Sequence, residues 1–187
     1  MGEPAKKRAT YDDLLAVPSP LVAEILDGKL VKSPRPGVAH AAATSALGGE
    51  LYSPFVRGKS GGPGGWIILD EPEVHLSDDV LVPDLAGWRR ARMPQVPQAA
   101  AVELAPDWVC EVLSPSTRAV DRAEKLPIYA REQVAYAWLV DPAEQLLEVL
   151  RLEGRRWSLL DTWHGDAKVR AEPFEAIELD LSFLWAR

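Results

Sequence analysis

Cysteine is almost absent from the 187-residue sequence, which contains only Cys110. A single cysteine cannot form an intramolecular disulfide bond, and it cannot build a cysteine-based zinc site. Cys110 lies in the apolar run "WVCEV". We therefore expect it to be a buried packing residue, with a reactive thiol as the alternative.

Long hydrophobic runs are also missing. No apolar stretch approaches the roughly 20 residues that a helix needs to cross a bilayer. The first residues, "MGEPAKKRATYDD", lack the apolar centre of a signal peptide. These absences predict a cytoplasmic protein that does not enter a membrane.

Basic residues are outnumbered, because 21 Lys and Arg face 28 Asp and Glu and give a net charge of -7. This charge argues against a protein that wraps DNA through a broad basic surface. It does not exclude a nuclease, since divalent ions bound to clustered carboxylates can supply the missing positive charge. The local group Arg89, Arg90 and Arg92 is interpreted as a solvated loop, with a phosphate-contacting loop as the alternative.

The remaining composition is that of an ordinary globular protein, with 47% hydrophobic and 26% charged residues. The length suits one domain over residues 1–187. We expect a core over about residues 11–142, with C-terminal strands over residues 143–187 that extend its sheet.

Periodicity and turn signals predict the elements of this domain. A short helix capped by Thr10 is followed by a hairpin around Asp27-Gly28, and the stretch "PGVAHAAATSALGGELYSPFV" is the best candidate for a long helix. Strands are expected at 65–76, 79–88, 107–114 and 136–142, and a helix at 118–133 that bends or starts late at Pro127. Three more strands are expected at 145–153, 156–163 and 176–185. The order predicts an α/β fold in which a mixed sheet is flanked by helices.

Two carboxylates interrupt apolar strands. Asp84 follows Pro83 in "VLVPDLAGW", and Glu111 lies inside "WVCEVLS". If these strands are neighbours in the sheet, both side chains converge near one end of it. A buried pair of acids is costly without a cation or a shared proton. Carboxylate oxygens suit Mg2+ or Mn2+, so the pair predicts a metal site.

The block "EVLSPSTRAVDRAEK" followed by "YAWLVDP", preceded by "VPD" and "EILDGKLV", resembles the Uma-type bacterial endonuclease family. This family belongs to the PD-(D/E)xK superfamily, which has a restriction-endonuclease-like fold. The resemblance covers about residues 11–185, and the block at 108–141 is its most specific part. It implies the same fold for this chain.

The resemblance also implies site residues. Asp84 matches the aspartate of the PD half, and Glu111 matches the acid of the second half. Leu113 stands where the superfamily carries lysine, and Lys125 in the next helix is the matching residue. A long ammonium side chain can reach the same point from another backbone position. The alternative for Lys125 is an i, i+4 ion pair with Asp121.

Two further residues are implied with less specific roles. Glu24 matches an acid that the family carries before its first long helix, where it would complete the metal shell or position water. His40, near the start of that helix, would contact a phosphate, and its alternative is an ordinary core or surface histidine. Gln133 is left without an assigned role, and Asp121 is interpreted as a partner on the helix surface.

The implied function is Mg2+- or Mn2+-dependent hydrolysis of DNA phosphodiester bonds. Asp84 and Glu111 would hold the ion, and Lys125 would orient the attacking water or stabilise the developing negative charge. Double-strand cleavage needs two sites, so we expect a homodimer. Two alternatives stay open: an inactive nuclease-fold interaction module, and a metal-dependent hydrolase of another phosphate ester.

Overall fold

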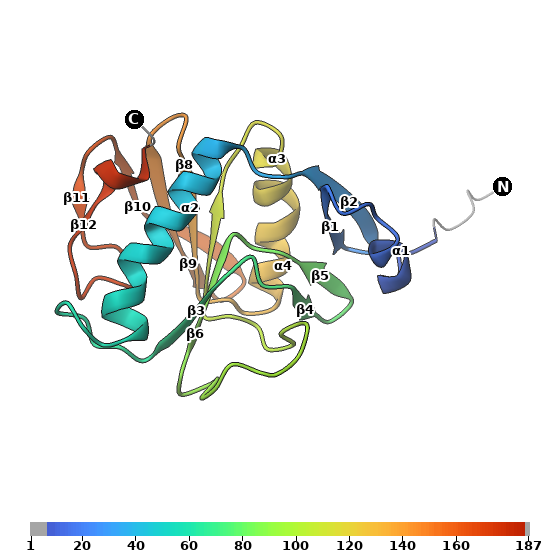
Figure 1. Cartoon of the computed structure of the whole chain (residues 1–187), viewed down its shortest axis with the longest axis horizontal. Coiled ribbons are helices and arrows are strands. Elements are labelled where there is room, and N and C mark those ends of the chain that lie inside the picture. The colour runs from blue at the N-terminus through green and yellow to red at the C-terminus, as the bar shows by residue number, and fades with distance from the viewer. Residues whose placement is uncertain (1–6, 186–187) are drawn as a thin grey trace.

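A six-stranded mixed sheet forms the centre of the computed structural model, which describes residues 7–185 (Figure 1). Its strand order is β10-β9-β8-β7-β6-β3. Only the β7–β8 pairing is parallel. The strands are β3 (Trp66–Asp70), β6 (Leu85–Arg89), β7 (Trp108–Val112), β8 (Tyr136–Asp141), β9 (Leu146–Glu153) and β10 (Arg156–His164). The predicted mixed sheet and its antiparallel C-terminal extension are confirmed.

Helical segments cover both faces of this sheet (Figure 1). On one face lies α2 (Val38–Leu51), which continues into the π-helical segment η1 (Tyr52–Val56). On the other face, α3 (Arg118–Val120), η2 (Asp121–Lys125) and α4 (Leu126–Arg131) form one helical run. The described helices include none that is long and apolar enough to span a membrane.

The side chains of β7 alternate between the two faces, as strand geometry requires. Trp108, Cys110 and Val112 pack into the core beneath α2, whereas Val109 packs into the core beneath α4. All five residues of β7 are buried. Glu111 therefore projects from a buried strand toward the helical run that carries Lys125.

That helical run widens into the π-helix η2 immediately before Pro127. A proline in a regular α-helix has no N–H to donate, and its ring crowds the carbonyl four residues earlier. The backbone N–H of Leu126 donates to the carbonyl of Asp121, five residues back, so the widened turn relieves this crowding. The predicted irregularity at Pro127 thus takes the form of a π-helical turn that ends at Lys125.

A second, four-stranded sheet has the order β2-β1-β5-β4 and lies over one end of the large sheet (Figure 1). Its strands are β1 (Leu21–Leu26), β2 (Lys29–Pro34), β4 (Val74–Leu76) and β5 (Asp79–Leu81). Asp27 (φ 49°) and Gly28 (φ 76°) form the expected tight turn of the β1–β2 hairpin. The predicted N-terminal helix is α1 (Tyr11–Leu15), and Thr10 and Asp13 close its capping box.

The prediction of single strands at 65–76 and 79–88 was wrong. Each segment divides into two strands, one in each sheet: β3 and β4, then β5 and β6. Glu71 adopts a positive φ of 42° and is followed by Pro72, while Pro83 lies in the second break. Prolines cannot donate to a strand ladder, so both segments change direction there. This division places Asp84 at the start of β6.

The strand predicted at 176–185 was also wrong over most of its length. Only β12 (Leu179–Asp180) is extended, and it pairs with the short β11 (Lys168–Val169). Leu181–Leu184 forms the 3-10 helix η3, whose first turn is capped when the Asp180 side chain accepts the Ser182 N–H. Leu181 and Leu184, three residues apart, are then both buried in the core beneath α2. The cap and the i, i+3 spacing explain the helical turn.

Candidate active site

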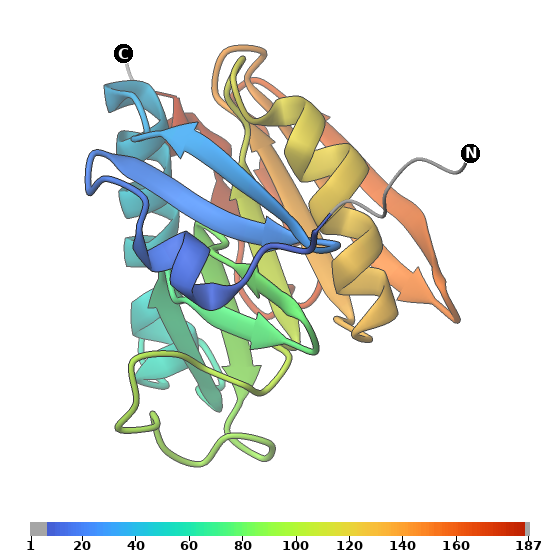
Figure 2. The same cartoon turned by 90° about the vertical axis from the view of Figure 1, so that its right-hand side faces the viewer.

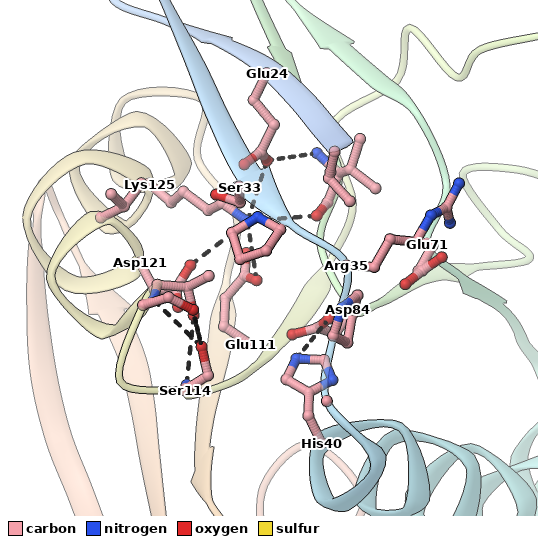
Figure 3. Close-up of a pocket in the computed structure, with 18 of the residues that line it drawn as sticks. Glu24, Ser33, Arg35, His40, Glu71, Asp84, Glu111, Ser114, Asp121 and Lys125 are labelled. Carbon is pink, nitrogen blue, oxygen red and sulfur yellow. Dashed lines mark hydrogen bonds and ion pairs between the residues drawn. The ribbon is translucent and has the colours of Figure 1, made fainter. Parts of the chain in front are cut away.

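A cavity of about 270 Å³ lies where the β1–β2 hairpin, the start of α2, the ends of β6 and β7, and η2 meet (Figure 3). Arg35 and Lys125 are the permanently cationic side chains in its described lining. The carboxylates that line it are more numerous: Glu24, Glu71, Asp84, Glu111 and Asp121. The cavity is therefore strongly acidic, and Asp84, Glu111, Lys125, Glu24 and His40 all line it.

Asp84 is positioned by contacts to both of its carboxylate oxygens. The Val112 N–H at the end of β7 donates to Oδ2 at 2.7 Å, and Nε2 of His40 lies 3.1 Å from Oδ1. The side chain is 14% exposed, which makes it the most accessible carboxylate of the cluster formed with Glu24, Glu111 and Asp121. Because β6 and β7 are neighbouring antiparallel strands, Asp84 and Glu111 reach the same end of the sheet.

Glu111 is almost completely buried and is held at both oxygens. Its Oε1 accepts the Tyr129 hydroxyl at 2.6 Å, and its Oε2 lies 3.1 Å from the Lys125 ammonium. Burial raises the pKa of Glu111 well above its usual range, and nearby acids reinforce this against the opposing effect of Lys125. Two side chains of the helical run, Lys125 and Tyr129, thus hold the two oxygens of the Glu111 carboxyl.

Lys125 lies at the centre of three carboxylates. Its Nζ is 3.1 Å from both Glu24 and Glu111 and 3.6 Å from Asp121, and it donates to the Val82 carbonyl at 3.3 Å. Burial alone would lower the pKa of Lys125, but the surrounding acids outweigh it and raise that pKa well above its usual value. The i, i+4 pair with Asp121 exists as one part of this larger cluster. The interpretation of Asp121 as a helix-surface residue was wrong, because Asp121 is buried at 3% exposure.

Glu24 enters the cavity from β1 and is 4% exposed. Its Oε1 accepts the Val82 N–H at 2.8 Å and also contacts Lys125. The loop between β5 and β6 therefore supplies both a donor to Glu24 and an acceptor to Lys125. These contacts fix the small sheet against the helical run that carries the lysine.

His40 stands in the first turns of α2 and faces Asp84 (Figure 3). Burial would lower the pKa of His40, but the hydrogen bond and charge of Asp84 outweigh burial and raise it. Its Nδ1 is buried, and it has no hydrogen-bond partner among the described residues. His40 and Asp84 form a dyad at one side of the cavity, and the Lys125 cluster lies at the other.

Tyr129 belongs to the site, although it was not predicted from the sequence. Asp121, Lys125 and Tyr129 follow one another at intervals of four residues, so they share one face of the helical run. That spacing was the available signal, because it puts a phenol on the same face as the lysine. Burial and the adjacent Glu111 raise the pKa of Tyr129 well above its usual value, so the hydroxyl remains a proton donor.

The chemistry of the donors suits a hard divalent cation. Carboxylate oxygens are the preferred ligands of Mg2+, and the cavity holds more acids than its own cations neutralise. Within residues 7–185, however, no three His, Cys, Asp or Glu side chains are arranged to hold an ion together. The contacts explain this, since the oxygens face Lys125, Tyr129 and backbone N–H groups.

Comparisons with known proteins agree with this architecture. A crystal structure of a putative nuclease belonging to DUF820 from Anabaena variabilis ATCC 29413 is similar, with a TM-score of 0.73 and 26% sequence identity. The similarity covers 95% of this chain and 97% of that one. No curated protein matches the sequence. Residues 8–182 match the family Uma2, described as "Putative restriction endonuclease", and the chain therefore belongs to the Uma2 family.

Proposed function

We propose that this chain is a metal-dependent endonuclease that hydrolyses phosphodiester bonds of DNA. The observation that carries the proposal is the buried Lys125–Glu111 pair beside Asp84 in one acidic cavity. A buried ammonium surrounded by three acids is costly to maintain for packing alone, because each charge must be desolvated. Perturbed, mutually coupled groups in a cavity are typical of catalytic sites.

The proposed chemistry assigns a task to each side chain. Asp84 and Glu111 would hold Mg2+ or Mn2+, which when bound supplies positive charge to the phosphoryl group and activates water. Lys125 would donate to the negative charge that develops on the phosphoryl oxygens. Glu24 would orient the attacking water, and protonated His40 would contact a neighbouring phosphate.

The proposed cleavage of both DNA strands favours an assembly of two copies of the chain. One cavity can cut one strand at a time, so cleavage of both strands calls for two copies. We propose a homodimer that acts in the cytoplasm, and sedimentation of the purified chain with and without DNA tests its assembly.

The decisive experiment compares metal binding and plasmid cleavage in the same proteins. Calorimetry with Mg2+ and Mn2+ is done on the wild type and on Asp84→Ala combined with Glu111→Ala, followed by cleavage assays. Lys125→Met is assayed in parallel and should lose roughly 100-fold or more in rate, the usual effect of removing a group that stabilises developing charge. Exposed Lys168→Met and Glu175→Gln are the matched controls and should cut like the wild type.

Folding must be separated from chemistry, because the substituted residues are buried. Thermal melts identify any variant that fails to fold, and Glu111→Gln keeps the volume of the side chain and one of its two acceptor oxygens. Metal binding and cleavage that disappear together in folded variants support the nuclease. A wild type that binds neither ion and cuts nothing contradicts it, and hydrolysis of mononucleotides without plasmid cleavage would favour another phosphate ester as substrate.

A further inference from the structure

A second concave surface lies on the opposite side of the helical run from the acidic cavity. This groove of about 400 Å³ is formed by η2, α4 and the β9–β10 turn. Its charged lining consists of Arg122, Arg131, Arg155 and Arg156, named here the arginine groove, and no described acidic side chain lines it. In a chain with a net charge of -7, four converging arginines are an exception to the overall charge.

Two of these arginines are fixed by ion pairs behind the groove. Arg122 pairs with Glu148 on β9. Arg131 contacts Asp27 at 2.9 Å and Glu132 at 3.0 Å, and it also pairs with buried Asp79. These contacts hold the helical wall of the groove in place. The paired carboxylates also neutralise much of the positive charge of both guanidinium groups.

The other two arginines are free. Arg155 and Arg156 are exposed at the β9–β10 turn, and neither has an ion-pair or hydrogen-bond partner for its side chain within residues 7–185. Both also sit beside Gly154, whose φ of 67° allows the tight turn that brings them to the groove. Two consecutive unpaired guanidinium groups offer up to ten N–H donors in planar forks, the geometry that matches phosphate oxygens.

The floor between the two walls is apolar and rigid. Leu126, Pro127 and Ala130 form it together with Trp157. The Trp157 indole N–H donates to the Leu126 carbonyl at 2.8 Å, which fixes the ring to the helix. The floor therefore supplies no anion of its own to compensate Arg155 and Arg156, and an external anion is the missing partner.

We propose that the arginine groove binds the phosphodiester backbone of a nucleic-acid strand, with Arg155 and Arg156 as its free phosphate contacts. The inference rests on the proposed function and adds where the substrate is held. In Figure 2 the helical run, yellow, lies between the blue β1–β2 hairpin over the cavity and the orange β9–β10 hairpin. A strand held in the groove would therefore lie against the helix whose other face carries Lys125.

The test measures binding rather than cleavage. Fluorescence anisotropy of labelled duplex and single-stranded DNA and of RNA is recorded in chelator over a salt series, for the wild type and for Arg155→Gln with Arg156→Gln. Losing two phosphate contacts should weaken binding by roughly tenfold and reduce the slope of log affinity against log salt by about 2. Arg57→Gln with Lys59→Gln removes the same charge from exposed loop positions outside the groove and should bind like the wild type.

Each outcome decides the proposal. Unchanged affinity and salt slope in the Arg155 and Arg156 variant would overturn it, as would a wild type that binds none of the three nucleic acids. An equal loss in the Arg57 and Lys59 control would assign the effect to net charge and would also overturn it. Groove-dependent binding by a wild type that cuts nothing would leave the groove in place and remove the endonuclease function.

Discussion

Glu111 has both of its carboxylate oxygens held by other side chains, Tyr129 on one and Lys125 on the other. The side chain is 2% exposed, so bulk water has little access to either oxygen. A buried acceptor that loses its donor bears the full cost of its desolvation. Tyr129 is therefore a positioning residue for Glu111, and removing its hydroxyl should measurably lower the stability of the fold.

Tyr129→Phe removes this hydroxyl and leaves the ring in the core. We expect the free energy of unfolding to fall by about 2 kcal/mol, because Oε1 of Glu111 is left buried without a donor. Chemical denaturation measures the loss. Tyr52→Phe is the matched control: Tyr52 is 52% exposed and its hydroxyl has no described partner, so its effect should stay within about 0.5 kcal/mol.

A double-mutant cycle with Glu111→Leu, which removes both acceptor oxygens, separates the hydrogen bond from packing of the ring. If the bond matters, Tyr129→Phe should cost less in the Glu111→Leu background, with a coupling of about 1 kcal/mol or more. Equal costs in both backgrounds would show that the hydroxyl does not act through Glu111. A positioning role also requires Mg2+ affinity, measured by calorimetry, to change in folded Tyr129→Phe.

The sequence was informative about single residues where the family pattern is specific. It directed attention to Asp84, Glu111 and Lys125, which the structure brings to one cavity. Tyr129 was missed because its spacing from Lys125 places the phenol on the lysine's face of the helix but does not show whether its hydroxyl donates to an acid. That difference depends on β7 lying opposite the helix, which is a tertiary contact.

At the scale of elements, Asp79 joins three segments that are distant in sequence. It begins β5 and is 2% exposed. It accepts the Asp27 N–H of the β1–β2 turn at 2.6 Å and pairs with Arg131 at the end of α4. This buried carboxylate therefore connects the small sheet to the helical run beside the acidic cavity.

Asp79→Ala should lower the free energy of unfolding by about 3 kcal/mol, because it leaves a backbone N–H and part of a guanidinium without their partner. The figure is at the low end for buried pairs, since Arg131 is 40% exposed and partly solvated. Hydrogen exchange should show faster opening of β1, β2 and β5 than of the large sheet.

The neighbouring residue Asp78 supplies the control. Its side chain is 78% exposed and, within the described chain, pairs only with exposed Arg8, so Asp78→Ala should change the free energy of unfolding little. Equal protection of both sheets in Asp79→Ala would contradict this role.

The sequence predicted elements well where local chemistry decides them. The Asp27-Gly28 turn, the Thr10 cap and the central strand β7 all depend on residues next to each other in the chain. The division of strands at Glu71 and Pro83 was missed because residues typical of strands, rich in Val, Ile and Leu, lie on both sides of each break. Whether such a run stays in one sheet or passes between two is decided by the pairing of β5 with β1 and of β4 with β5, of which the β1–β5 pairing is not local.

At the scale of the whole molecule, acidic charge is concentrated in the interior as well as on the surface. Glu24, Glu111 and Asp121 surround Lys125, so full ionisation leaves this buried cluster with excess negative charge. Burial and the mutual repulsion of the acids raise the pKa values of Glu111 and Asp121. The metal-free protein therefore carries a cost at neutral pH that acid conditions remove.

The sign of the pH effect follows from linkage. A carboxyl whose pKa is raised in the folded state binds more protons there than in the unfolded chain. Its stabilising contribution is complete below the unfolded value, 4.5 for Glu111, and is lost as the pH rises through the higher folded value. Each unit of difference corresponds to about 1.4 kcal/mol.

We therefore predict that, in chelator, the stability of the wild type relative to Glu111→Gln declines as the pH rises from 4.5 toward neutrality. Glutamine keeps the shape of the side chain but cannot ionise, so the difference between the two proteins isolates the charge of Glu111. Denaturation midpoints across the pH series measure this difference in stability. Glu50→Gln changes an exposed residue as a control, and its stability should follow that of the wild type at every pH. Saturating Mg2+ should stabilise the wild type by about 2.7 kcal/mol at 100 times its Kd and should stabilise Glu111→Gln less. Parallel pH profiles of the wild type and Glu111→Gln would show that Glu111 carries no such cost.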